Sequence, residues 1–234
     1  AGGRSSAAVG VRGQLLTWGT VQGNGGALFF SPIRSHVPKP VARPPGARVT
    51  RVAVGYEHVL ALTHAGKVLS FGRGSEGQLG HGDREDRRKP MQPIQALRGI
   101  CVAAIAAGAS HSLALTDEGA TLSFGRGSDG RLGHGDEMDR LKPRVIEAQR
   151  CVPVVAIAAG ACHSMVLTDE GAVLSFGTGS YGRLGHGDER VQLEPMVIEA
   201  LRGVRVVSMA AGGGHSLVLT DEGGVLSFGA GVSG

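Results

Sequence analysis

The sequence predicts an all-β protein, a β-propeller built from four-stranded antiparallel blades that repeat about every 52 residues. Three observations lead to this prediction. The same motifs return at a nearly constant interval, the motifs alternate as strands do, and the 234 residues include 40 glycines. So much glycine, without the three-residue period of collagen, is typical of a chain with many tight turns between short strands.

Two motifs set the interval. The first reads His-Ser-Leu-Ala-Leu-Thr-Asp-Glu-Gly in its clearest copy, and successive copies are separated by 53, 52 and 52 residues. Its copies begin at His58, His111, His163 and His215. The second reads Leu-Ser-Phe-Gly and keeps the same step. Its copies begin at Leu16, Leu69, Leu122, Leu174 and Leu226, and the copy at Leu16 is divergent. A period of about 50 residues indicates a propeller or a repeat array.

The first half of one repeat predicts a pair of strands joined by a hairpin. An apolar run, 105–108, stops at a glycine. Residues 111–116 follow, with Leu113 and Leu115 on one face and smaller or polar residues on the other, which is the alternation of a strand. Residues 116–119 are a hairpin loop in which Gly119 can adopt a positive φ. Residues 121–124 form the returning strand.

The second half of the repeat predicts a long loop and an edge strand. Residues 125–136 contain too many glycines for a helix and therefore form a looping excursion. Residues 142–146 supply the fourth strand, with Pro143 near its start, where no backbone donor is needed for the ladder.

The propeller segment is predicted to cover residues 13–234, preceded by a flexible N-terminal segment, residues 1–12, that lacks the apolar core of a signal peptide. The first repeat diverges: residues 23–30 replace the glycine-rich stretch of the later copies, and a basic, proline-rich stretch follows. The predicted repeats are residues 13–66, 67–119, 120–171 and 172–223, with a stub at 224–234.

Charge and cysteine content limit the classes of function. The net charge of +4 comes from scattered Lys and Arg, so nucleic acid is not the favoured partner. Three cysteines without a Cys-x-x-Cys spacing argue against a disulfide framework or a zinc site, and favour a reducing intracellular compartment, cytoplasmic or nuclear. No apolar run approaches the ~18 residues that a membrane span needs, so membrane insertion is not expected.

Recurring patterns that resemble chemical sites have structural interpretations. Residues 72–77 match the Gly-x-Gly-x-x-Gly fingerprint of dinucleotide sites, but the glycine-rich sequence after them cannot form the helix that such a site requires. Asp83, Asp136 and Asp188 stand beside glycines in equivalent loops, where carboxylates commonly bond local backbone donors.

Two series of histidines could suggest a metal site, but copies 52 residues apart lie on different blades. We expect each of these histidines to bond the backbone of a neighbouring loop. The sequence therefore predicts no catalytic residue, metal or cofactor. These histidines are His81, His134 and His186 in the loops and His58, His111, His163 and His215 at the strand starts.

The residues that differ between repeats are the better candidates for function, because loops on a rigid scaffold commonly carry it. They lie in the glycine-rich loops, in the stretches after them, and in the basic part of the first repeat; the alternative is that they are solvated surface. The candidate partner-binding residues are Arg73, Glu76, Arg84, Arg87, Arg88, Arg126, Asp129, Met138, Arg140, Tyr181, Arg190, Arg34 and Arg43.

The glycine-rich stretch Gly-x-Leu-Gly-His-Gly-Asp, at 77–83, 130–136 and 182–188, and the Ala-Ala-Gly-x-x-His-Ser stretch resemble the repeats of the regulator-of-chromosome-condensation family. The resemblance covers roughly residues 13–234. It implies that the segment is part of a seven-bladed ring; a closed four-bladed ring is the alternative. An incomplete ring would expose the faces of its end blades, so we expect further sequence or a partner subunit to cover them.

The leading functional hypothesis is a non-catalytic scaffold that binds protein partners within a larger protein or assembly, because a fold alone does not fix a function. The resemblance implies two alternatives: a guanine-nucleotide exchange factor for a Ran-like small GTPase, and the substrate-binding propeller of a HECT-type ubiquitin ligase. The regular spacing from Gly72 to Gly229 leaves only residues 20–50 for the insertion an exchange factor would use. A plant ultraviolet photoreceptor of this kind needs clustered tryptophans, whereas this sequence contains only Trp18.

Overall fold

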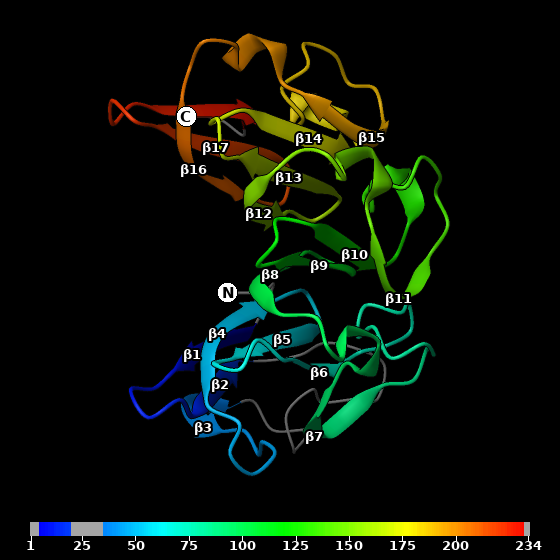
Figure 1. The fold of residues 1–234 in the computed structure, drawn as a ribbon, viewed down its shortest axis with the longest axis vertical. Coiled ribbons are helices and arrows are strands. Elements are labelled where there is room, and N and C mark those ends of the chain that lie inside the picture. Colours follow the sequence, from blue (N-terminus) through cyan, green and yellow to red (C-terminus); the bar gives the residue numbers. More distant parts are fainter. Residues whose placement is uncertain (1–4, 20–34, 232–234) are drawn as a thin grey trace.

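The computed structural model describes residues 5–19 and 35–231, and the statements that follow concern these residues. They form five antiparallel sheets arranged side by side in an open arc (Figure 1). The prediction of an all-β propeller with antiparallel four-stranded blades is therefore confirmed. The sheets do not close into a four-bladed ring (Figure 1), and the seven-bladed ring stays a prediction.

Three blades have all four strands, in sequence order from the inside of the arc to the outside (Figure 1). Blade 2 contains β4 (Val49–Val54), β5 (His58–Thr63), β6 (Val68–Gly72) and β7 (Arg87–Pro93). Blade 3 contains β8 (Val102–Ala107), β9 (His111–Thr116), β10 (Thr121–Gly125) and β11 (Arg140–Val145). Blade 4 contains β12 (Val154–Ala159), β13 (His163–Thr168), β14 (Val173–Gly177) and β15 (Gln192–Val197).

The two terminal sheets have three described strands each. Blade 1 contains β1 (Ser5–Val9), β2 (Leu15–Gly19) and β3 (Ser35–Pro40). Blade 5 contains β16 (Val206–Ala211), β17 (His215–Thr220) and β18 (Val225–Gly229). Five short 3₁₀ helices complete the described elements: η1 (Gln95–Leu97), η2 (Ser128–Gly130), η3 (Glu147–Gln149), η4 (Ser180–Gly182) and η5 (Glu199–Leu201).

The prediction of a flexible segment at residues 1–12 is wrong for Ser5–Val9, which form strand β1 and pair with β2 in the register Ser5↔Gly19 to Val9↔Leu15. This strand stands 53 residues before β5 and is an eroded copy of it, with Ser5 in the place of His58. The motif is not recognisable in β1, because the histidine and the leucines are absent. The extended backbone of β1 nevertheless forms its hydrogen-bond ladder with β2.

The blades do not begin where the predicted repeats begin. A repeat such as 67–119 starts just before the third strand of blade 2 and ends just after the second strand of blade 3. The period is the same in both descriptions, because a repeating chain can be divided at any fixed point of its unit. The domain limits themselves stay a prediction.

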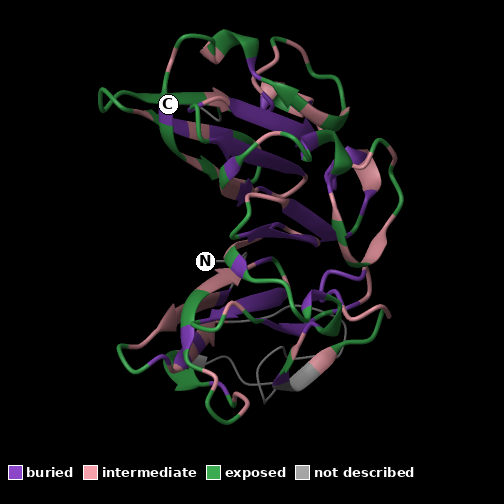
Figure 2. Cartoon of the chain, in the orientation of Figure 1, coloured by how far each residue is buried: buried purple, intermediate pink, exposed green. Residues whose placement is uncertain are grey.

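Burial in the second strand of each complete blade differs from the sequence expectation. Alternation predicted one apolar face for residues 111–116, yet all six residues of β9 are buried, as are those of β5 and β13. Neighbouring blades pack on both faces of these strands, so the polar face is covered as well (Figure 2). In β17, the second strand of blade 5 at the end of the arc, His215 and Leu219 are exposed instead.

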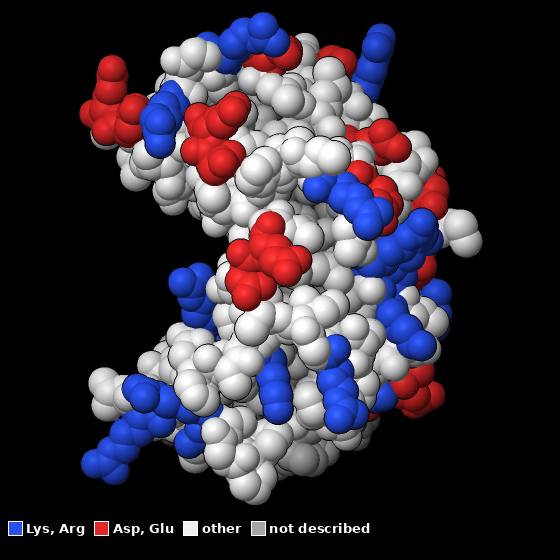
Figure 3. All heavy atoms as spheres, in the orientation of Figure 1, with Lys and Arg blue, Asp and Glu red and all other residues white. Residues whose placement is uncertain are grey.

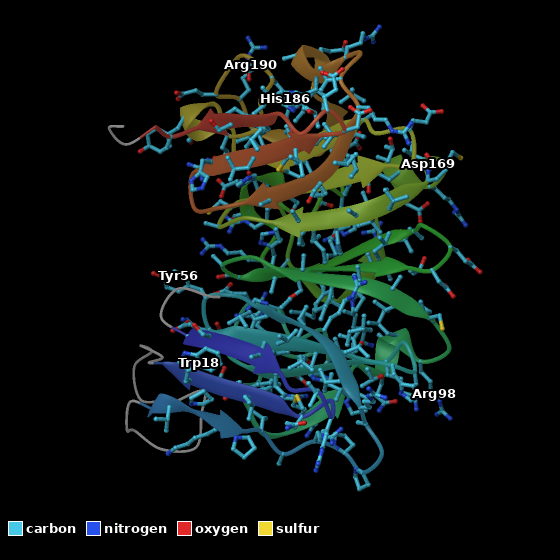
Figure 4. All side chains as sticks on the ribbon, turned by 90° about the vertical axis from the view of Figure 1, so that its left-hand side faces the viewer. Trp18, Tyr56, Arg98, Asp169, His186 and Arg190 are labelled. Carbon is cyan, nitrogen blue, oxygen red and sulfur yellow. The ribbon has the colours of Figure 1, made fainter. Side chains whose placement is uncertain are left out.

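Each blade has two ends, which carry different loops. We call one end the loop face: it holds the long loops 73–86, 126–139 and 178–191 and the turns 55–57, 108–110, 160–162 and 212–214. We call the other end the hairpin face: it holds the hairpins 64–67, 117–120, 169–172 and 221–224 and the segments 94–101, 146–153 and 198–205. In Figure 4, Tyr56 and Arg190 mark the loop face, while Arg98 and Asp169 mark the hairpin face.

Candidate functional site

Each long loop of the loop face is fastened to the turn of its own blade. The amide of Arg73 donates to the Glu57 carbonyl at 2.8 Å, and the amide of Arg126 donates to the Ser110 carbonyl at 2.9 Å. The loop of blade 2 also packs closely against blade 3. Gly77 has φ +83°, and a Cβ at this position would lie 2.7 Å from the side chain of Leu141. These loops are therefore turns of a fixed scaffold, as the interpretation of their glycine pattern expected.

The loop histidines hold the loops onto their strands. His81, His134 and His186 place Nε2 at 2.8, 2.9 and 3.0 Å from the hydroxyls of Ser70, Ser123 and Ser175. Each serine hydroxyl also donates to a loop carbonyl, as Ser123 does to Leu132 at 2.7 Å. Burial lowers the pKa of all three histidines, that of His134 to about 4. They are neutral structural groups at physiological pH.

The strand histidines join neighbouring blades. Nε2 of His58, His111 and His163 lies 2.9 Å from the hydroxyl of the serine in the next blade, which is Ser112, Ser164 and Ser216 in turn. Each serine donates its one hydroxyl hydrogen to a carbonyl in the loop of the preceding blade, at 2.8 Å. The histidine must therefore donate from Nε2, which makes it the neutral Nε2–H tautomer.

The expected partner of both histidine series was a loop backbone, and this is corrected: each partner is a serine hydroxyl, and the serine then reaches the backbone. For the strand histidines the sequence could not show this, because the bonded residues are 53 or 54 positions apart. Burial lowers the pKa of His58 and His163 to about 4, and that of His111 well below its ordinary value.

The loop aspartates bond nearby backbone amides, as predicted. Oδ1 of Asp83, Asp136 and Asp188 accepts from the amide two residues later, at 3.0 to 3.1 Å. Two of the candidate arginines complete these turns: Arg87 bonds Asp83 at 2.7 Å, and Arg140 bonds Asp136 at 2.6 Å. Arg190 lies 3.8 Å from Asp188 and is 85% exposed. Arg87 and Arg140 thus stabilise turns, and Arg190 is the accessible member of this series.

One candidate pair connects two blades on the loop face. Arg84 in the loop of blade 2 bonds Asp139 in the loop of blade 3 at 2.8 Å, and also donates to the Ser75 carbonyl. Glu76 lies 4.0 Å from the same guanidinium. The structure therefore brings Glu76 and Arg84 together.

The loop of blade 4 presents an aromatic ring. Tyr181 has φ +62° and is 66% exposed. The guanidinium of Arg183 lies 5.5 Å from the ring centroid, within the range of a cation–π contact. At the equivalent position of blade 3, Asp129 has φ +58° and pairs with the buried Arg131 at 2.6 Å. The same strained turn thus offers a carboxylate in one blade and an exposed aromatic ring in the next.

The remaining candidates are placed as follows. Arg73 pairs with Glu57, Arg126 is exposed and bonds Ser128, and Met138 is 65% exposed on the loop face. Arg43 precedes the turn that joins β3 to β4 and bonds the Ala47 carbonyl, so it lies on the hairpin face and not with the others. Arg34 and the side chain of Arg88 lie outside the described residues.

Several residues of the loop face were missed by the sequence reasoning. Tyr56 is 60% exposed beside a shallow hollow of about 260 Å³ that is lined by the inner turns of blades 2 to 5. The signal was present, because the other copies have Ala109, Ala161 and Gly213 at this position. Glu57 and Asp139 were missed because their partners become visible only in three dimensions.

Other chemical features of the described residues are few. No group of three or more His, Cys, Asp or Glu among residues 5–19 and 35–231 could hold a metal ion. Cys101, Cys151 and Cys162 are all unpaired thiols. No helix in this part of the chain has the length and hydropathy needed to cross a membrane. The arrangement on the loop face offers charged, aromatic and thioether side chains for contact.

Comparison with curated proteins finds relatives that are much longer. The chain is 38% identical over 231 residues to the human E3 ubiquitin-protein ligase HERC2, which covers 97% of this chain and 5% of that protein. It is 39% identical over 191 residues to the ultraviolet-B receptor UVR8 of Arabidopsis thaliana, covering 81% of this chain and 43% of the receptor. The chain therefore spans less than half the length of these relatives.

Solved structures show the same arrangement of blades. Human WBSCR16 superposes with a TM-score of 0.87 at 26% identity, covering 99% of this chain and 61% of that one. Prp20p, the RCC1 of Saccharomyces cerevisiae, superposes with a TM-score of 0.83 at 26% identity, and the match covers 97% of this chain and 56% of Prp20p. A family model described as the RCC1-like domain matches residues 1–234. The chain therefore belongs to the RCC1-like family, whose repeats its own repeats resemble.

Proposed function

We propose that this chain is a non-catalytic interaction module of a larger protein and that it binds a protein partner through the loop face. The observation that carries the proposal is a contrast on one scaffold: the inter-blade bonds repeat from blade 2 to blade 5, whereas the exposed loop side chains change in every blade. The unpaired thiols support a reducing, intracellular setting.

A set of loop substitutions tests this proposal in the full-length protein. The variant carries Met138→Glu, Tyr181→Glu and Arg190→Glu, three exposed positions in blades 3 and 4. The matched control carries Arg150→Glu and Arg202→Glu, two exposed positions on the hairpin face. Affinity purification with mass spectrometry should show partners lost from the loop variant and kept by the control. Identical partner sets, with unchanged circular dichroism, would contradict the proposal.

A more specific role is the substrate-binding propeller of a ubiquitin ligase. The similarity to HERC2 over 97% of the chain supports it. The test removes this segment from the full-length protein and follows the ubiquitination of a captured partner. Loss of partner modification, with self-modification retained, is the expected result. Absence of any ubiquitin-transferring domain in the full-length protein would exclude this role.

The second specific role is nucleotide exchange on a small GTPase. It is supported by the structural similarity to Prp20p, whose structure was described together with its binding to Gsp1p and histones. The full-length protein would then accelerate release of a fluorescent guanine nucleotide from a Ran-like GTPase. No acceleration at micromolar protein excludes the role. Light sensing as in UVR8 is not proposed, since Trp18 is the one tryptophan of the chain.

A further inference from the structure

The hairpin face has a groove at blade 2. Its volume is about 770 Å³, against about 420 Å³ for the corresponding groove of blade 4. The walls are the turn 44–47, the hairpin 63–67 and the segment 93–101. Apolar side chains of strands β6 and β7 and of the segment 93–101 line the groove, and Ile100 is 37% exposed there. We call this the second-blade groove.

The charge of this groove differs from that of the same place in the later blades. The hairpins of blades 3, 4 and 5 carry an Asp-Glu pair, at Asp117-Glu118, Asp169-Glu170 and Asp221-Glu222. Blade 2 has His64-Ala65 in their place. Two residues further on, Lys67 replaces an alanine or glycine. The hairpin of blade 2 has therefore lost both acids and gained a cation.

The opposite wall shows the same change. In blades 3 and 4, Arg150 pairs with Glu147 at 3.2 Å and Arg202 pairs with Glu199 at 2.9 Å. In blade 2 the arginine is kept as Arg98, but Gln95 stands where the glutamate would be. Arg98 and Lys67 are both exposed, and neither has an ion pair among the described residues.

The figures show where these charges lie. Arg98 stands on the hairpin face, on the same side as Asp169 and away from Tyr56 (Figure 4). On this face, acidic side chains follow the inner edge of the upper blades, with basic side chains beside them and at the top, whereas the charged side chains over the lower blades are mostly basic (Figure 3). The acidic hairpin of blade 3 adjoins one end of the groove, because the amide of Asp117 bonds the carbonyl of Cys101, a lining residue, at 3.0 Å.

We propose that the second-blade groove binds a short acidic segment of a partner protein, with carboxylates at Lys67 and Arg98 and an apolar side chain against Ile100 and the groove floor. Two unpaired cations beside an apolar hollow fit a few carboxylates and one anchoring residue. A long polyanion such as nucleic acid fits poorly, because the acidic hairpins of the next three blades repel it. The inference rests on the proposed role as a binding module but uses the opposite face.

The test measures binding of a fluorescein-labelled hexapeptide of five glutamates and one leucine by fluorescence anisotropy. A peptide with lysines in place of the glutamates and a single-stranded oligonucleotide are the comparison probes. We expect the acidic peptide to bind, and to bind more weakly as salt is raised. The double variant Lys67→Ala and Arg98→Ala should lose at least ten-fold in affinity.

Two matched variants keep the test specific. Gln95→Glu restores the ion pair found in blades 3 and 4. The variant should therefore fold normally, and its affinity for the acidic peptide should fall several-fold because Arg98 is now paired. Arg150→Ala removes the equivalent arginine of blade 3 and should leave the affinity unchanged. Equal affinity of the Lys67/Arg98 double variant and the unaltered protein would overturn the proposal, as would equal loss from Arg150→Ala or stronger binding of the oligonucleotide.

The peptide-binding test of the groove and the partner-capture test of the loop face can fail separately. If the peptide fails to bind while partners are still lost from the loop-face variant, the groove proposal is wrong and the proposed function stands. If the loop-face variant still captures all its partners while peptide binding requires Lys67 and Arg98, the groove proposal stands and the binding face was assigned wrongly.

Discussion

The contact between blades 1 and 2 differs from the three contacts that follow it. At each later contact a buried histidine donates to a serine of the next blade. At the first contact Ser5 occupies the histidine position and Val59 occupies the serine position. Ser5 is 3% exposed, and its hydroxyl has no hydrogen-bond partner among the described residues. Apolar packing replaces the polar bond there, with Ala7 and Val9 against the core that includes Val59.

The difference shows that an inter-blade contact has two separate roles: it holds the blades together, and it positions the long loop. Apolar burial is enough to hold one blade against another, as the first contact shows. The histidine and serine add a link to the loop face, because the same serine hydroxyl bonds the loop carbonyl of Gln78, Arg131 or Arg183. The bond therefore fixes the position of each long loop relative to the next blade. Loops held in this way can vary their exposed residues without moving.

The largest effect should follow from crowding a later contact. Gly108 lies against the His111 ring and the Gly160 carbonyl, and a Cβ would overlap both. Because backbone cannot move aside cheaply, Gly108→Ala should lower the free energy of unfolding by about 3 kcal/mol or more. Urea denaturation measures it. Gly213→Ala, where nothing lies within 4 Å, is the control and should change it by less than about 0.5 kcal/mol.

Sequence reasoning reached the elements that each repeat defines by itself. It predicted the strand 111–116 with the limits that β9 has, and the local bond of Asp136. It missed β1, because Ser5–Val9 had lost the motif, and it gave no face for Arg43, because the first repeat diverges and offers no copy to align it with. The bonds between blades were out of reach: residues such as Arg84 and Asp139 are 55 positions apart and meet only when the blades stack.

Acid should weaken the later contacts selectively. The folded pKa of His58 and His163 is lowered from 6.5 to about 4, chiefly by burial, so the unfolded chain binds their protons first as the pH falls. Stability is fully present above about pH 6.5 and declines down to about pH 4, by roughly 3 kcal/mol at most per histidine. A proton added at Nδ1 has no acceptor, since this atom is buried without a partner.

Urea midpoints measured at pH 7, 6, 5 and 4 check this dependence. His163→Gln should flatten the curve, whereas Ser5→Ala, at the contact that lacks the histidine, should leave its shape unchanged. A midpoint that stays constant from pH 7 to pH 4 would refute the account of the buried histidines.

Removing the serine of a later contact should have a smaller effect. Ser164→Ala leaves Nε2–H of His111 buried without an acceptor, which should cost about 1–3 kcal/mol in the free energy of unfolding. Ser5→Ala is the matched change at the first contact and should be neutral or slightly stabilising, because its hydroxyl has no partner to lose. Chemical denaturation of both variants gives the comparison. Equal destabilisation would show that the polar bond contributes nothing beyond packing.

The smallest effect should come from the ion pair that spans the same contact at the surface. Arg84 and Asp139 connect the loops of blades 2 and 3, and their side chains are 51% and 24% exposed. The next contact has no such pair, since Val191 takes the place of Asp139 and Glu137 that of Arg84. The loop of blade 3 is nonetheless held in place by the buried Ser164. Arg84→Ala should therefore cost only about 0.2–1 kcal/mol, and the cost should shrink in high salt. A salt-independent loss above about 2 kcal/mol would mean that the surface pair, rather than the buried serine, fixes the loops.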